Sequence, residues 1–95
     1  MKFLEELDFT NDEINELKDV APKKILDLIK NQEQLISQNI TYLKDLGVNN
    51  YKEIFLRYYD MFLMDHSNFT EVFSKYETED LILKLNKNIK IVEYL

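Results

Sequence analysis

Apolar residues recur along this chain at intervals of three and four, the spacing of one face of an α-helix. The longest stripe predicts a helix over 32–46, and it consists of Leu35, Ile36, Ile40, Leu43 and Leu46. Gly47 follows at the position where a left-handed residue ends many helices. Because strand-like alternation is absent, we expect an all-α fold, a compact array of short helices stacked or bundled without a sheet.

Shorter stripes and capping signals predict the remaining helices. The segment Thr10-Asn11-Asp12-Glu13 is typical of a capping box and predicts a helix start, with Pro22 at its end or in the first turn of the next helix. Further N-caps are expected at Asn31, at Asn49 or Asn50, at Thr78-Glu79-Asp80, and at Asn86 or Asn88. A helix from about residue 51 is expected to bury Tyr51, Ile54, Phe55, Tyr58, Met61 and Phe62, and Asp65-His66-Ser67-Asn68 is expected to be a polar break before Phe69.

A heptapeptide pattern occurs twice, as Phe3-Leu4-Glu5-Glu6-Leu7-Asp8-Phe9 and Tyr42-Leu43-Lys44-Asp45-Leu46-Gly47-Val48. A shortened third copy, Glu93-Tyr94-Leu95, stands at residues 93–95. Repetition at this spacing is typical of units that bury their apolar faces by stacking on one another. We therefore expect one domain over 1–95, with repeat-like units at about 3–41 and 42–68 and a helical extension over 69–95.

The two units resemble the helical repeats of the mitochondrial transcription termination factors. The first unit carries the resemblance through Phe3-Leu4, Leu7, Phe9, Ile14, Pro22 and Ile25-Leu26, with Asp8 in place of the usual glycine. The second carries it through Tyr42-Leu43, Leu46-Gly47-Val48, Ile54 and Arg57-Tyr58-Tyr59, with Asp60 where proline is expected. The resemblance implies a stack of helices, and members of the family bind duplex DNA or RNA along a basic concave face.

Charge argues against that activity in this chain. Twelve Lys and Arg against eighteen Asp and Glu give a net charge of −6, whereas phosphate binding depends on cationic side chains. One basic cluster has helical spacing, since Lys84, Lys87 and Lys90 would share a face of one continuous helix. The candidate nucleic-acid face comprises Arg57, Lys75, Lys84, Lys87 and Lys90, and the candidate acidic docking face comprises Glu5, Glu6, Asp12, Glu13, Glu16 and Asp19.

Catalytic and metal-binding signatures are missing from the sequence. The chain has no cysteine, a single glycine and a single histidine, His66, which we expect at the surface or in a loop. The aromatic series Tyr51, Phe55, Tyr58 and Phe62 is interpreted as core rather than as a base-stacking surface, with Arg57 and Tyr59 off that stripe. We therefore expect no enzyme activity, no cofactor and no metal.

The preferred hypothesis is a non-enzymatic protein-interaction module or small regulatory adaptor with a protein partner. A homodimer that covers Val92, Tyr94 and Leu95 is a further expectation. The alternatives are a nucleic-acid-binding regulator, which follows from the resemblance, and an acidic mimic of nucleic acid of phage or plasmid origin. The N-terminus becomes acidic before any apolar signal region forms, and no segment is apolar enough for a bilayer, so we expect a cytoplasmic protein without membrane contact.

Overall fold

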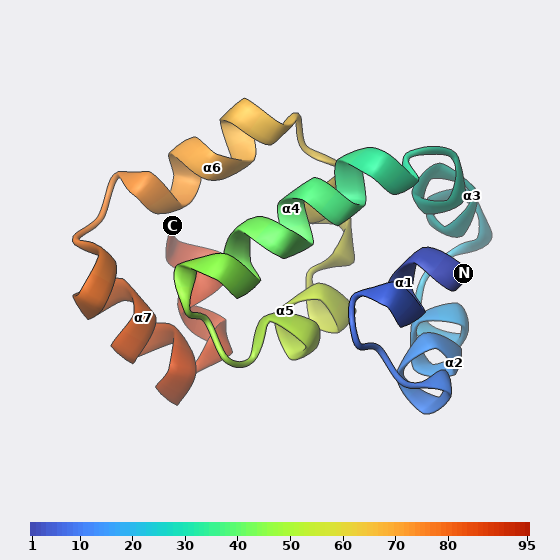
Figure 1. Cartoon of the computed structure of the whole chain (residues 1–95), viewed down its shortest axis with the longest axis horizontal. Coiled ribbons are helices and arrows are strands. Elements are labelled where there is room, and N and C mark those ends of the chain that lie inside the picture. The colour runs from blue at the N-terminus through green and yellow to red at the C-terminus, as the bar shows by residue number, and fades with distance from the viewer.

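All 95 residues are described by the computed structural model, and every regular element is a helix (Figure 1). In chain order the elements are α1 (Lys2–Glu6), α2 (Asn11–Val20), α3 (Lys23–Asn31), α4 (Glu33–Leu46), α5 (Tyr51–Arg57), the 3₁₀ helix η1 (Tyr59–Leu63), α6 (His66–Ser74), α7 (Thr78–Lys87) and the 3₁₀ helix η2 (Ile89–Tyr94). The all-α prediction is confirmed. None of the helices combines the length and apolarity needed to cross a bilayer.

Helix α4 runs through the middle of the molecule and packs against α1, α3, α5, η1 and α6 (Figure 1). Its predicted apolar stripe is confirmed, because Ile36, Ile40 and Leu43 are completely buried. Helices α2 and α3 lie at one end of the molecule and α7 at the other (Figure 1). The core is thus organised around one central helix.

The second heptapeptide ends α4 with a Schellman turn. Gly47 adopts a φ of +104°, the Val48 N–H donates to the Leu43 carbonyl over 3.2 Å, and the Gly47 N–H donates to the Lys44 carbonyl over 3.2 Å. Leu43 and Val48 are both completely buried, which supplies the apolar contact that usually accompanies this motif.

The first heptapeptide ends α1 in the same way, with Asp8 in the role of Gly47. Asp8 is the only non-glycine residue with a positive φ, at +73°. The Phe9 N–H donates to the Leu4 carbonyl over 3.0 Å, and the Asp8 N–H donates to the Glu5 carbonyl over 3.1 Å. The two copies of the pattern therefore encode the same helix stop. The first copy accepts the strain of a left-handed aspartate.

A chain of phenylalanines connects the elements around α4. Ring centroids lie 5.6 Å apart between Phe9 and Phe55, 5.1 Å between Phe55 and Phe62, and 5.0 Å in each of the next two steps, to Phe69 and Phe73. Such aromatic pairs add roughly 0.5–1.5 kcal/mol each beyond the burial of their area. The interpretation of Phe55 and Phe62 as core is confirmed, and Tyr58 is only half-buried.

Two expected helix starts are wrong. Asn31 is the last residue of α3, and Gln32 separates it from α4 without a side-chain cap. At α7 the cap is Glu77, whose carboxylate accepts the N–H groups of Glu79 and Asp80. The capping box of Thr10 and Glu13 is confirmed by hydrogen bonds in both directions, of 2.8 and 3.1 Å.

The loop between α4 and α5 uses its asparagines to hold α7. Asn50 occupies the N-cap position of α5 but makes no cap; its Nδ2 instead donates to the Leu85 carbonyl over 2.8 Å. The Asn49 N–H donates to Oδ1 of Asn86 over 3.1 Å. Asn88 caps η2 by accepting the Lys90 N–H, which confirms one of the two expected positions.

The helix expected to continue from Tyr51 to Phe62 is broken. Helix α5 ends at Arg57, and the chain continues as η1. The break lets Phe62 reach the core from a second element while the chain turns back along α4.

Asn39 fixes that returning segment. Its side chain is completely buried on α4, and its Nδ2 donates to the carbonyls of Phe62 and Met64, both over 2.9 Å. Its Oδ1 lies 2.8 Å from Nδ1 of His66. Because the amide nitrogen is committed to two carbonyls, the oxygen must be the acceptor and His66 the donor. One amide therefore joins α4 to the end of η1 and to the start of α6.

Replacing Gly47 with alanine should destabilise the protein by about 1–2 kcal/mol, because alanine resists the left-handed conformation. A Cβ there would lie 3.5 Å from Cδ1 of Ile82, an ordinary contact, so the cost is conformational. Urea unfolding measures it. An unchanged urea midpoint in Gly47→Ala would contradict this assignment.

Replacing Asn39 with leucine should cost about 1–3 kcal/mol for each carbonyl that loses its donor inside the protein. Urea unfolding with circular dichroism detection gives the value. The matched control is His66→Ala, which keeps both amide-to-carbonyl bonds and should lose less than half as much. An equal loss of unfolding free energy in the two variants would show that the hydrogen bonds from Asn39 to the carbonyls do not supply most of the stabilisation.

Candidate functional site

The acidic surface expected from the sequence lies on α1 and α2. We define the acidic face as the five exposed carboxylates Glu5, Glu6, Asp12, Glu16 and Asp19. None of them lies within 4 Å of a basic group of the same chain, since the ion pairs of the structure involve other carboxylates. Their negative charge is therefore directed to solvent.

The amphipathic pattern of α2 explains why three of these carboxylates lie together. Ile14 and Leu17 are buried and hold one side of α2 against the core. Asp12, Glu16 and Asp19 are spaced i, i+4 and i+7, so they share the opposite side. The same apolar spacing that fixes the helix on the core thus aligns its carboxylates outward.

Glu13, the sixth predicted member, does not belong to this surface. It is half-buried, accepts the Thr10 N–H through Oε1, and lies 3.7 Å from Nζ of Lys52 through the same oxygen. The capping box and Lys52 therefore occupy one of its two carboxylate oxygens. The prediction that Glu13 joins the docking face is wrong because its capping position turns it toward its own backbone.

Asp8 is a second carboxylate with an internal partner. Its Oδ2 accepts from Nζ of Lys44 over 2.9 Å, and this hydrogen bond and the lysine charge lower the pKa of the Asp8 carboxyl. The same contact raises the pKa of Lys44. The two heptapeptide turns are thereby connected directly, since Lys44 belongs to the second copy.

The cations of the candidate nucleic-acid face do not form one helical surface. Helix α7 ends at Lys87, and Asn88 is extended, with φ −155° and ψ 108°, so Lys90 belongs to a separate element. Lys84 pairs with Asp80 over 2.9 Å. The prediction that Lys84, Lys87 and Lys90 share one continuous helix is wrong, because Asn88 caps η2 instead of continuing α7.

The other two cations of that face come from distant elements. Arg57 is the last residue of α5, and Lys75 follows the end of α6; both are exposed. The neighbouring aromatics Tyr58 and Tyr59 are half-buried. Tyr58 donates its hydroxyl to Glu93 over 2.6 Å, which raises the pKa of Tyr58 and holds η2 in place. Tyr58 is thus engaged within the fold.

A basic surface that sequence reasoning missed lies on α3. We define the basic face as Lys23, Lys24 and Lys30, which are exposed and have no carboxylate within 4 Å. Ile29 on the opposite side is completely buried. In the sequence, the two lysines directly after Pro22 indicate a basic surface. Only the packing of α3 shows which side of the helix faces solvent.

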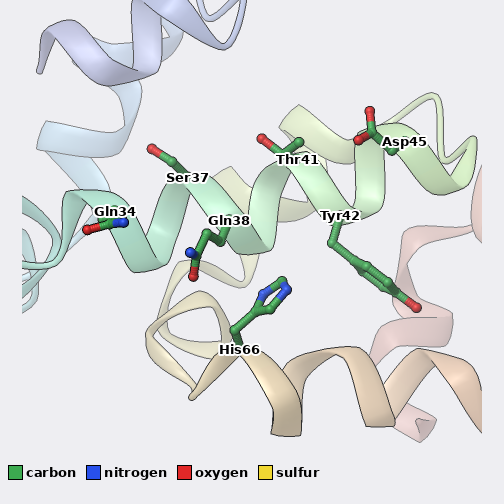
Figure 2. Close-up of a pocket in the computed structure, with 7 residues that line it drawn as sticks. All are labelled: Gln34, Ser37, Gln38, Thr41, Tyr42, Asp45 and His66. Carbon is green, nitrogen blue, oxygen red and sulfur yellow. The ribbon is translucent and has the colours of Figure 1, made fainter.

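A polar groove follows α4 where α6 begins. Its volume is about 510 Å³, it is open to solvent, and its lining consists of Gln34, Ser37, Gln38, Thr41, Tyr42, Asp45 and His66. Figure 2 shows Gln38, Tyr42 and His66 directed into the space between the two helices. Amides, hydroxyls and one imidazole give this groove hydrogen-bonding capacity.

His66 lies on this groove as the first residue of α6, not in a loop. The expectation of a polar break at 65–68 is therefore wrong: Asp65 precedes the helix, and its side chain accepts the Ser67 hydroxyl over 2.6 Å, which lowers the pKa of Asp65. His66 is half-buried beside Tyr42, with ring centroids 6.3 Å apart. No group of three or more His, Asp or Glu side chains converges on a metal position.

The C-terminal end offers less apolar surface than expected. Val92 is buried in the core of its own chain and Leu95 is half-buried, whereas Tyr94 is 82% exposed. Val92 is therefore not available for the expected dimer contact. Of the three residues expected at that contact, only Tyr94 and part of Leu95 are exposed.

Comparison of the chain with models of protein families, with curated proteins and with solved structures finds no match. The resemblance to the termination-factor repeats therefore stays a prediction. Three features are left for a functional argument: the acidic face, the basic face and the polar groove.

Proposed function

We propose that this protein is a non-enzymatic interaction module that binds another protein through its acidic face. The single observation that carries the proposal is the exposure of Glu5, Glu6, Asp12, Glu16 and Asp19 without a basic partner in their own chain. Such a surface attracts a basic partner and raises the rate of productive encounter.

An exposed apolar side chain lies beside the carboxylates of α2. Val20, the last residue of α2, is 54% exposed and follows Glu16 by one helical turn. Carboxylates at the rim of an interface chiefly give orientation and specificity, while burial of apolar area gives much of the affinity. The α2 surface therefore offers carboxylates for orientation and one exposed apolar side chain beside them.

Neutralising the acidic face should abolish partner binding without unfolding the chain. Zero-length carbodiimide cross-linking in extract from the native source couples carboxylates of the wild type to partner lysines. The variant Asp12→Asn/Glu16→Gln/Asp19→Asn should lose at least roughly tenfold of the cross-linked complex, because it loses both the attraction between opposite charges and the carboxylates that the carbodiimide couples.

The matched control is Glu53→Gln/Glu71→Gln/Glu79→Gln, which removes three exposed carboxylates from other helices. This control should retain the complex, and circular dichroism should show both variants folded. Equal loss in both variants would attribute the effect to net charge alone and contradict a localised docking face.

The competing hypothesis, nucleic-acid binding, follows from the resemblance and has one observation in its favour. Arg57, Lys75, Lys87 and Lys90 are exposed and have no ion-pair partner in the chain. An acidic mimic of nucleic acid is the further alternative, and its partner would be a nucleic-acid-binding protein held at the same acidic face.

Fluorescence anisotropy with labelled duplex DNA and RNA separates these hypotheses. We expect no binding at about 50 mM salt, because repulsion by the net charge is strongest at low ionic strength. Binding that weakens steeply with salt and disappears in Lys84→Glu/Lys87→Glu/Lys90→Glu would establish the nucleic-acid alternative instead. The corresponding reversal of Lys23, Lys24 and Lys30 serves as the control surface.

A further inference from the structure

Two exposed helical faces of opposite charge lie at the same end of the molecule. Helices α2 and α3 are consecutive and occupy one end of the long axis (Figure 1). The first presents Asp12, Glu16 and Asp19, and the second presents the basic face, Lys23, Lys24 and Lys30. None of these six groups forms an ion pair within the chain. Three negative charges therefore stand unpaired on one of two consecutive helices and three positive charges on the other. Asp27, four positions after Lys23 and three before Lys30, is also exposed and unpaired on α3.

Each face also carries one exposed apolar side chain in the same relation to its charges. Val20 is 54% exposed and lies one turn after Glu16, while Leu28 is 46% exposed and lies one turn after Lys24. The two helices thus repeat one arrangement, a charge followed by an apolar residue four positions later, with opposite signs. Such a pair of surfaces is complementary to itself.

We propose that a second copy of this chain docks at this end, with α2 of each copy against α3 of the other. In a twofold arrangement the contact between residue i and residue j occurs twice. Asp12, Glu16 and Asp19 of each copy therefore meet the basic face of the other, and Val20 and Leu28 are covered. This proposal rests on the proposed function, because it names a second copy of the chain as one partner of the α2 carboxylates. In this proposal the dimer contact lies at the α2–α3 end and not at the C-terminal end.

A second copy matches more of this end of the molecule than a purely basic partner does. A basic partner would match the carboxylates of α2 and leave Lys23, Lys24 and Lys30 unpaired. A second copy satisfies both faces at once. The net charge of −6 on each copy opposes association, and Asp27 is the one carboxylate on α3, so the dimer is weak and dependent on concentration. High salt should dissociate it, because exposed pairs are screened.

Sedimentation velocity over a concentration series tests the proposal with two charge-reversed variants. One is Asp12→Lys/Glu16→Lys/Asp19→Lys, and the other is Lys23→Glu/Lys24→Glu/Lys30→Glu. The wild type should dimerise at about 50 mM salt. Each variant alone should raise the dissociation constant by at least roughly tenfold, because like charges then meet at both contacts.

The third sample is the equimolar mixture of the two variants. In the mixture the lysines of one variant meet the carboxylates of the other at both contacts, so the heterodimer should form even though neither variant pairs with itself. Single substitutions, Glu16→Lys and Lys24→Glu, repeat the test with smaller perturbation if a triple variant fails to fold. Reversal of Lys75, Lys87 and Lys90 to glutamate is the distal control and should leave the wild-type dimerisation intact.

A wild type that stays monomeric at all concentrations, or a mixture that fails to associate, overturns the dimer. Equal disruption by the distal control also overturns it. The proposed function is tested separately, because carbodiimide cross-linking to a different protein that requires Asp12, Glu16 and Asp19 would persist with a strictly monomeric chain. If the wild type dimerises but cross-links to no other protein, the proposed function is refuted and the dimer is not.

Discussion

The buried amide of Asn39 is the interaction on which the path of the second half of the chain depends. A carboxamide enclosed in an apolar core is costly unless its donors and acceptor are used. Asn39 donates to the carbonyls of Phe62 and Met64 and accepts from His66. These contacts hold the end of η1 against α4 and place the start of α6 beside it.

The aromatic core follows from this attachment. With η1 held on α4, Phe62 packs 5.1 Å from Phe55 on one side and 5.0 Å from Phe69 on the other. The phenylalanine chain therefore passes from α5 through η1 into α6 without a gap. The same contact positions one side of the polar groove between α4 and α6. His66, the hydrogen-bond partner of Asn39, also lines that groove.

Local signals in the sequence were sufficient for the fold class and for α4, but not for contacts between distant residues. The stripe of Ile36, Ile40 and Leu43 and the stop at Gly47 depend only on neighbours a few positions away, and both are confirmed. The break after Arg57 depends instead on a distant residue. The aromatic spacing continues through the break to Phe62, and no neighbouring residue shows that Asn39, more than twenty positions earlier, donates to the carbonyls of Phe62 and Met64.

The candidate site was predictable to the extent that one helix defines it. Asp12, Glu16 and Asp19 share a side of α2 because the buried side is evident from Ile14 and Leu17. The lysine cluster failed because its spacing was counted across Asn88, where the backbone becomes extended. The basic face of α3 was missed because a nine-residue helix with several apolar positions leaves its solvent side ambiguous until packing selects Ile29 for the core.

Pro22 keeps the opposite charges of α2 and α3 from pairing within one helix. On one uninterrupted helix Asp19 and Lys23 would stand at i, i+4, the spacing at which a carboxylate and a lysine pair within the same chain. The extended backbone of Ala21 and Pro22 ends α2 and redirects α3, and no such pair forms. The break keeps both sets of charges exposed and separate. An acidic chain thus retains a local basic surface that its net charge conceals, and intermolecular pairing can satisfy charges that the fold leaves unpaired.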